Sequence, residues 1–260
     1  MSLNILNHFD KSNLNGITVF KLKEDERKNF LEKLPGPFRS LYLSDEILNE
    51  RIKLFGSSRI NEILEKIPDQ ANIQSGEFAE LLLYFFIPEC YISGDCLNPP
   101  KWKWKQHKNR ALQFTDVLIL QIKTKDNPSV EDFLIAVESK AQATKPGKDV
   151  IRLHDAIRGS EEDYVSRLAE SLVYLKARYK DELNVDSVKY LERFMETPRF
   201  PSYIKYFKAV GIVDDEFAGN ELSKADPTSK IIKDSLEVIL ISMKDMKEIY
   251  ENVYSQMPNK

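Results

Sequence analysis

Phe133-Leu-Ile-Ala-Val-Glu-Ser-Lys140 is a run of five apolar residues that ends at a pair of opposite charges. A short uninterrupted apolar run is typical of a strand buried in a sheet. Because side chains alternate along a strand, Glu138 and Lys140 are expected on one face and Ser139 on the other. The sequence therefore predicts a carboxylate and an ammonium group that point the same way at the edge of a core.

A second carboxylate falls within the preceding predicted strand, residues 114–122. Asp116 is unusual there because aspartate is a poor strand former. Either a hydrogen bond close to a turn or a metal ion would explain its presence. Residues 123–132 form a polar connection of hairpin length, so we expect two antiparallel neighbours with Asp116 opposite Glu138.

A third carboxylate, Glu80, lies on a helix predicted over residues 75–86. The second half of this helix, residues 81–86, is apolar all round and should be buried. A carboxylate beside such a surface is costly unless a partner compensates its charge. Glu80 is therefore expected either to form a salt bridge or to face a metal site.

These carboxylates favour metal-dependent chemistry. Two carboxylates about 4 Å apart repel by about 4 kcal/mol at an effective dielectric of about 20, and a hard divalent cation would turn that repulsion into attraction. Mg²⁺ prefers a few carboxylates plus water and phosphate oxygens, with Mn²⁺ as the alternative ion. We predict that Glu80, Asp116 and Glu138 hold this ion and that it activates a water. Lys140 would orient the water or stabilise the transition-state oxygens.

A basic, tryptophan-containing segment, residues 101–110, precedes the Asp116 strand. If the segment is extended, its two tryptophans share one face and its lysines line the other. Aromatic side chains can stack on bases while lysines contact phosphates, although a solvated hairpin whose tryptophans cover the sheet explains the pattern equally well. The candidate nucleic-acid contacts are Lys101, Trp102, Lys103, Trp104, Lys105 and Gln142.

Composition limits the class of protein. The 260 residues are 42% hydrophobic and 30% charged, which is typical of a folded globular protein. We see no apolar run of membrane-spanning length and no signal peptide, so we expect a cytoplasmic protein without a membrane partner. A net charge of −3 means that any nucleic-acid surface is local. Cys90 and Cys96 are too few for a disulfide framework, and we expect reduced thiols.

We expect an N-terminal accessory region over residues 1–70 and one large domain over 71–260. In the accessory region we predict a strand at Ile17–Leu22, a helix over 25–34 stopped by Pro35-Gly-Pro37, and a longer helix from Ser44 to about residue 66. Gly56-Ser-Ser58 is a possible break in this longer helix. Further on, we predict a strand at 88–92, a helix capped by Ser160 with Val165 on its buried stripe, strands at 203–213 and 236–242, and a closing helix over 244–256.

The order of these motifs resembles the PD-(D/E)xK nuclease superfamily. The matching residues are Gly76-x-x-x-Glu80, Asp116 and Glu138-x-Lys140, within residues 72–160. Thr115 precedes Asp116, where the superfamily's name has a proline. The resemblance implies an α/β (mixed α+β) fold with a restriction-endonuclease-like core, a central mixed sheet flanked by helices, and here a mostly helical N-terminal extension.

More narrowly, the chain resembles HamA, the nuclease family of Hachiman anti-phage systems. The resemblance rests on Ser75-Gly-Glu-Phe-Ala-Glu-Leu-Leu-Leu83, Phe114-Thr-Asp116 and Ala136-Val-Glu-Ser-Lys140. It implies a DNA-degrading effector that pairs with a helicase subunit, HamB, which restrains it until damaged or foreign DNA is sensed. The alternatives are a catalytically silent nuclease fold that binds DNA or a partner, and a simple ion pair between Glu138 and Lys140.

Overall fold

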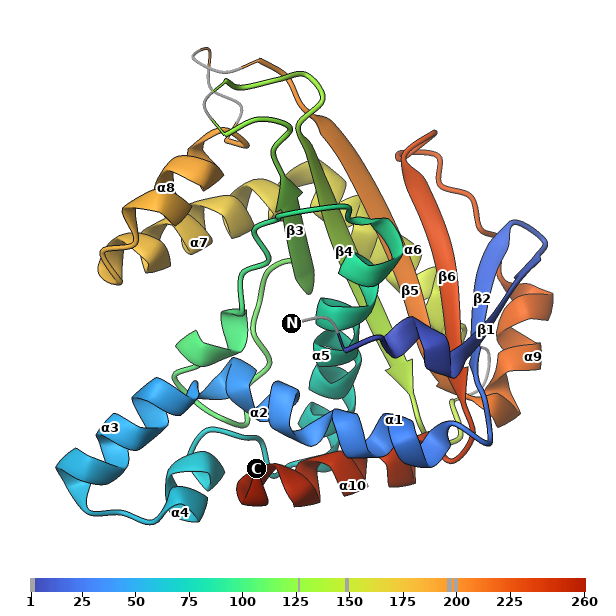
Figure 1. Cartoon of the computed structure of the whole chain (residues 1–260). Coiled ribbons are helices and arrows are strands. Elements are labelled where there is room, and N and C mark those ends of the chain that lie inside the picture. The colour runs from blue at the N-terminus through green and yellow to red at the C-terminus, as the bar shows by residue number, and fades with distance from the viewer. Residues whose placement is uncertain (1–2, 126, 148–149, 196–197, 199–200) are drawn as a thin grey trace.

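Within the residues that the structure describes, six strands form one mixed sheet in the order β1-β2-β6-β5-β4-β3 (Figure 1). The computed structural model describes residues 3–125, 127–147, 150–195, 198 and 201–260. The neighbouring strands β2, β6, β5 and β4 run parallel, whereas β1 and β3 lie antiparallel at the two edges. The strands are β1 (Phe9–Leu14), β2 (Ile17–Leu22), β3 (Val117–Gln121), β4 (Phe133–Gln142), β5 (Ile204–Asp214) and β6 (Leu236–Met243).

Helices cover both faces of this sheet, which confirms the predicted mixed α/β class. None of the helices in the described ranges is both long and apolar enough to cross a membrane. One face carries α1 (Arg27–Lys33), α2 (Pro35–Tyr42), α5 (Ala71–Tyr91) and α10 (Met246–Gln256), and the other carries α6 (Arg152–Glu162), α7 (Leu168–Asp181), α8 (Val185–Glu192) and α9 (Asp215–Lys224).

The predicted alternation along β4 is confirmed. Ile135 and Val137 are buried in the core beneath α5, whereas Leu134 and Ala136 are buried in the core beneath α7. Such burial on both faces explains why the strand is an unbroken apolar run rather than an alternating one. The next residues of β4 keep the same alternation and therefore deliver side chains to both layers.

The N-terminal region contributes to the sheet as well as to the helices around it. β2 matches its predicted bounds and pairs with β6, so strands from both sides of residue 70 share one sheet. The boundary at residue 70 stays a prediction. As predicted, α1 ends at Lys33, just before the Pro35-Gly-Pro37 segment. The same segment forms the first turn of α2, where proline is favoured because its missing N–H needs no partner.

The longer helix predicted from Ser44 is interrupted at Gly56-Ser-Ser58, the possible break named from the sequence, and forms α3 (Asp45–Phe55) and α4 (Arg59–Leu64). Ser44 caps α3 as expected, since its side chain accepts a hydrogen bond from the Ile47 N–H. Gly56 ends the helix in the left-handed region, with φ 67°. A glycine tolerates this conformation without steric cost, which explains the break.

The strand predicted at 88–92 is wrong, because α5 continues through it to Tyr91. Pro88 lies inside the last turns of the helix and has no N–H to donate to the carbonyl of Tyr84. The Asn98 side chain donates to that carbonyl instead, at 2.8 Å. A tertiary hydrogen bond thus permits a proline that the local pattern treats as a helix end.

Candidate active site

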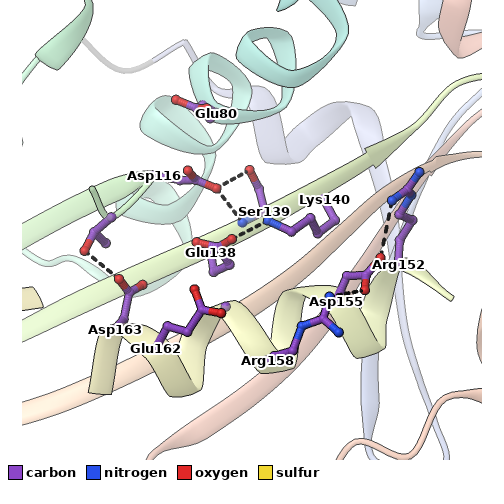
Figure 2. A network of polar contacts seen from close by, with 12 residues as sticks. Glu80, Asp116, Glu138, Ser139, Lys140, Arg152, Asp155, Arg158, Glu162 and Asp163 are labelled. Atoms are coloured by element: carbon purple, nitrogen blue, oxygen red, sulfur yellow. Dashed lines mark hydrogen bonds and ion pairs between the residues drawn. The ribbon is translucent and has the colours of Figure 1, made fainter. Parts of the chain in front are cut away.

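The site lies where β4 runs past the start of its edge neighbour β3. β3 pairs with residues 133–137 of β4, so within the described part of the chain the stretch from Glu138 onward pairs with β5 and with no strand on its other side. Asp116 immediately precedes β3, opposite Glu138 in the continued register, as predicted. Its Oδ2 accepts hydrogen bonds from the Ser139 N–H at 2.8 Å and the Ser139 hydroxyl at 2.9 Å (Figure 2). Asp116 therefore occupies the edge that β3 leaves open.

The strand expected from residue 114 begins only at Val117. Phe114 has a φ of 91°, a left-handed backbone conformation that does not belong to a strand. Asp116 is thus a residue of the turn into the strand, and the predicted hydrogen bond close to a turn is present. That hydrogen bond holds one carboxylate oxygen against the backbone of β4.

Four residues singled out from the sequence line one cavity of about 620 Å³. Glu80 approaches from α5, Glu138 and Lys140 approach from β4, and Asp116 lies between Glu80 and Glu138 in Figure 2. Arg152, Arg167 and Glu170 also line this cavity. The structure therefore brings together three carboxylates and one ammonium group from three separate segments of the chain.

Glu138 is 2% exposed and is held by two cations. Lys140 Nζ donates to its Oε1, and Arg167 Nη2 lies 2.5 Å from its Oε2. Burial, together with the charge of Asp116, raises the pKa of Glu138 to about 7, and the two cations oppose this shift. The carboxyl also packs against Gly159 of α6, where an added Cβ would lie 2.5 Å from Glu138 Cδ.

Glu80 pairs with a lysine that the sequence did not single out as part of the active site. Lys101 Nζ lies 3.0 Å from Glu80 Oε2 and 3.9 Å from Asp116 Oδ1, and it donates to the Thr115 carbonyl at 3.1 Å. Burial raises the pKa of Glu80 to about 8 against the opposing charge of Lys101. Of the two explanations given for Glu80, the salt bridge is therefore present, and it lies beside the other acids.

Arg167 is a second site residue that sequence reasoning missed. It belongs to a π-helical turn, Asp163–Arg167, that joins α6 and α7. Its Nε lies 2.7 Å from Asp163 Oδ1, and the same oxygen accepts a hydrogen bond from Thr115 at 2.8 Å. This chain of contacts links Glu138 on β4 to the turn that carries Asp116. π turns inside helices occur frequently at functional sites.

The π turn also corrects the predicted helix start. Ser160 lies inside α6 and caps nothing, because α6, the π turn and α7 follow one another without a break. Val165 was expected on the buried stripe, but it is 70% exposed. The wider turn rotates the helix, so the stripe resumes at Leu168 and Leu172.

The basic segment is not extended, contrary to the prediction. Lys101–Trp104 is a 3₁₀ turn, with three residues per turn, so the tryptophans do not share a face. Trp102 is 2% exposed in the core beneath α5, and Lys105 is buried against Glu77. Trp104 packs on the α7 side and, like Lys103, contacts Glu182. Lys101, Trp102 and Lys105 are thus placed in the interior, so we do not propose them as DNA contacts.

Gln142, the remaining candidate contact, is also buried. Its Oε1 accepts a hydrogen bond from Arg152 Nε at 2.7 Å, and its Nε2 donates to the Thr144 carbonyl. Arg152, rather than Gln142, is the one that lines the cavity. The structure therefore places Gln142 behind an arginine that it can orient.

A comparison with known protein families matches residues 2–257 to HamA. The chain belongs to the HamA family. No curated protein matches the sequence. HamA membership supports a role in anti-phage defence, and it agrees with the resemblance carried by the residues around Glu80, Asp116 and Glu138.

The donor set of this HamA site suits Mg²⁺ or Mn²⁺ in its chemistry, because all three acids offer hard carboxylate oxygens. Glu80 Oε2 is buried, and its contact with Lys101 Nζ at 3.0 Å shows that this oxygen attracts a cation. Among the described residues, no group of three His, Cys, Asp or Glu side chains is arranged to hold a metal ion. The predicted cage is therefore not preformed among them, and Lys101, Lys140 and Arg167 compensate the carboxylates instead.

The raised pKa of Glu138 in this HamA site predicts that the stability of the fold depends on pH. Burial raises the pKa of Glu138 from 4.5 to about 7, so between these values the folded chain holds a proton that the unfolded chain has released. The stability that Glu138 contributes is present below the unfolded value and is lost as the pH rises through about 7. We expect the unfolding free energy of wild type, relative to Glu138→Gln, to fall over this range.

Urea unfolding of both proteins from about pH 5 to about pH 8.5 measures this difference. The glutamine variant serves as the reference for the wild type, since its side chain resembles the protonated carboxyl and cannot titrate. A difference that stays constant with pH, or that rises, would contradict the raised pKa.

Proposed function

We propose that this HamA-family chain is a divalent-metal-dependent deoxyribonuclease that acts in anti-phage defence. The observation that carries the proposal is the convergence of Glu80, Asp116, Glu138 and Lys140 on one cavity at the open edge of β4. A structural ion pair alone gives no reason for three acids from separate segments to gather there, since each carboxylate adds a desolvation cost.

Glu80, Asp116 and Glu138 are the residues that would hold Mg²⁺ or Mn²⁺. When bound, such an ion supplies an activated water and neutralises charge on a phosphate. Asp116 keeps its carboxylate aimed at the cavity through the two hydrogen bonds from Ser139. Glu138 is fixed from the other side by Arg167 and by the close approach of Gly159.

Lys140 is the proposed catalytic cation. Its side chain is 35% exposed, so it can leave Glu138 and donate to the attacking water or to a developing phosphate oxygen. Arg152 lines the same cavity and is 30% exposed in its side chain, which suits a contact with the DNA backbone. These cations supply the local positive charge that a chain of net charge −3 needs for nucleic acid.

A helicase subunit is the proposed partner that controls the nuclease. The N-terminal helices are candidates for its docking surface, because α3 carries the exposed apolar side chains Leu54 and Phe55, 73% and 69% exposed. Exposed apolar residues that lie together are typical of protein contact surfaces. The partner would act by covering or uncovering the cavity, a role that requires no change in the residues of the site.

Metal removal tests the proposed activity. The full chain, alone and with its helicase subunit, is incubated with plasmid, linear duplex DNA and RNA in Mg²⁺, Mn²⁺ or EDTA, and products are resolved on gels. We expect DNA cleavage with either metal, none in EDTA, and recovery when the metal is restored. Binding of DNA without cleavage in any metal would instead favour a catalytically silent binding module, and cleavage of RNA alone would contradict a deoxyribonuclease.

A further inference from the structure

Lys101 lies where a cation shared by two of the site's carboxylates would lie. Its ammonium group contacts Glu80 of α5 at 3.0 Å and Asp116 of the β3 turn at 3.9 Å, and the two acids come from different segments. Besides these two carboxylates, the ammonium group is held by its hydrogen bond to the Thr115 carbonyl. Its side chain is 7% exposed, so water does not screen these contacts.

The geometry points to Lys101 as a residue that competes with the divalent cation for Glu80 and Asp116, and so sets the metal concentration at which the site fills. This inference rests on the proposed function, because it assumes that a divalent cation binds these acids. A carboxylate that is paired with an ammonium group is only partly available to another cation. The apparent association constant for the metal is then the intrinsic constant multiplied by the fraction of molecules in which the pair is open.

A purely structural role for Lys101 makes the opposite prediction. If the lysine only neutralises Glu80 for the sake of the fold, its removal leaves a buried carboxyl without a partner. The variant would then lose stability and bind metal no better than the wild type. Competition predicts a gain in metal affinity, which loosened packing does not produce.

The test measures Mn²⁺ binding to the full chain without DNA, by electron paramagnetic resonance of the free ion. We expect Lys101→Met to bind Mn²⁺ at least about tenfold more tightly than wild type. Lys103→Met is the matched control, because Lys103 belongs to the same 3₁₀ turn but pairs with Glu182 outside the site. Its Mn²⁺ affinity is expected to equal that of wild type.

Equal or weaker Mn²⁺ binding by folded Lys101→Met would overturn the inference while leaving the proposed function in place. Absence of Mn²⁺ binding in wild type and in every variant would overturn the proposed metal dependence itself. Should Lys101→Met not fold, Lys101→Gln serves in its place. Its amide can still donate to Glu80 but carries no charge, so the same gain in affinity is expected and the same outcome would refute it.

Discussion

Replacing Glu138 by glutamine, or Lys140 by methionine, is expected to abolish measurable DNA cleavage while the chain stays folded. Glutamine keeps the shape of Glu138 but loses the charge that a divalent cation needs, and losses of this kind are about 10²–10⁴-fold. Removing the Lys140 donor is expected to cost about 10²–10³-fold, as for other groups that stabilise a developing oxyanion. Initial rates of plasmid cleavage in Mg²⁺ measure both effects.

The fold should survive the loss of the Glu138 charge because neither of its two cationic partners, Lys140 and Arg167, is left buried without compensation. Lys140 is 35% exposed and can turn to water, and Arg167 keeps its contact with Asp163. Glu170→Gln is the matched control, since Glu170 lines the same cavity from an exposed position on α7. It removes one negative charge and should leave the rate within about twofold. Wild-type rates for folded Glu138→Gln would refute the assignment of this carboxylate.

Local sequence patterns were sufficient to predict the strand that carries Glu138 and Lys140. The apolar run of β4, the position of Glu138 and Lys140 at its end, and the antiparallel pairing with the Asp116 segment follow from alternation and from a connection of hairpin length. Glu80 could be found because a carboxylate at the start of an apolar helix half needs compensation. These inferences depend only on residues close in sequence and on the regular periods of side-chain direction in strands and in helices.

The cations that surround these acids could not be found in the same way. Arg167 reaches Glu138 across 29 residues of sequence, and its direction depends on a π turn. Lys101 points inward because its segment forms a 3₁₀ turn, whereas the alternation of lysine and tryptophan suggested a strand. One usable indication was present: Glu77 and Glu80 lie one turn apart on a buried helix face and require cations, and the next basic segment in the chain provides Lys105 and Lys101.

The role of Gly159 has no local sequence signal, for a different reason. A glycine inside a helix normally lowers stability by roughly 0.5–1 kcal/mol relative to alanine. Such a glycine is explained when another group packs so closely on the helix backbone that a Cβ would not fit. Here the Glu138 carboxyl packs directly on the helix backbone of α6. This contact joins α6 and β4, which no local sequence pattern connects, so the need for a glycine at this position becomes evident only from the tertiary structure.

Gly159→Ala is therefore expected to reduce cleavage by about 10²-fold or more, the size of effect produced by displacing a reacting group by about 1 Å. The new Cβ would lie 2.5 Å from Glu138 Cδ and 2.6 Å from Cγ, so the carboxyl must leave the position in which Lys140 and Arg167 hold it. Gly219→Ala is the matched control, because Gly219 lies in helix α9 with nothing within 4 Å of an added Cβ. It should stabilise the fold by roughly 0.5–1 kcal/mol and leave the cleavage rate unchanged.

A thermodynamic cycle separates this displacement from a general effect on α6. In the wild-type background, the helix-propensity gain of Gly159→Ala is offset by the collision with Glu138, so little or no stabilisation is expected. In the Glu138→Ala background the collision is gone, and the same substitution should gain the roughly 0.5–1 kcal/mol seen at Gly219. Urea unfolding gives all four free energies. Equal effects of Gly159→Ala in both backgrounds would mean that the glycine does not position Glu138, whatever happens to the cleavage rate.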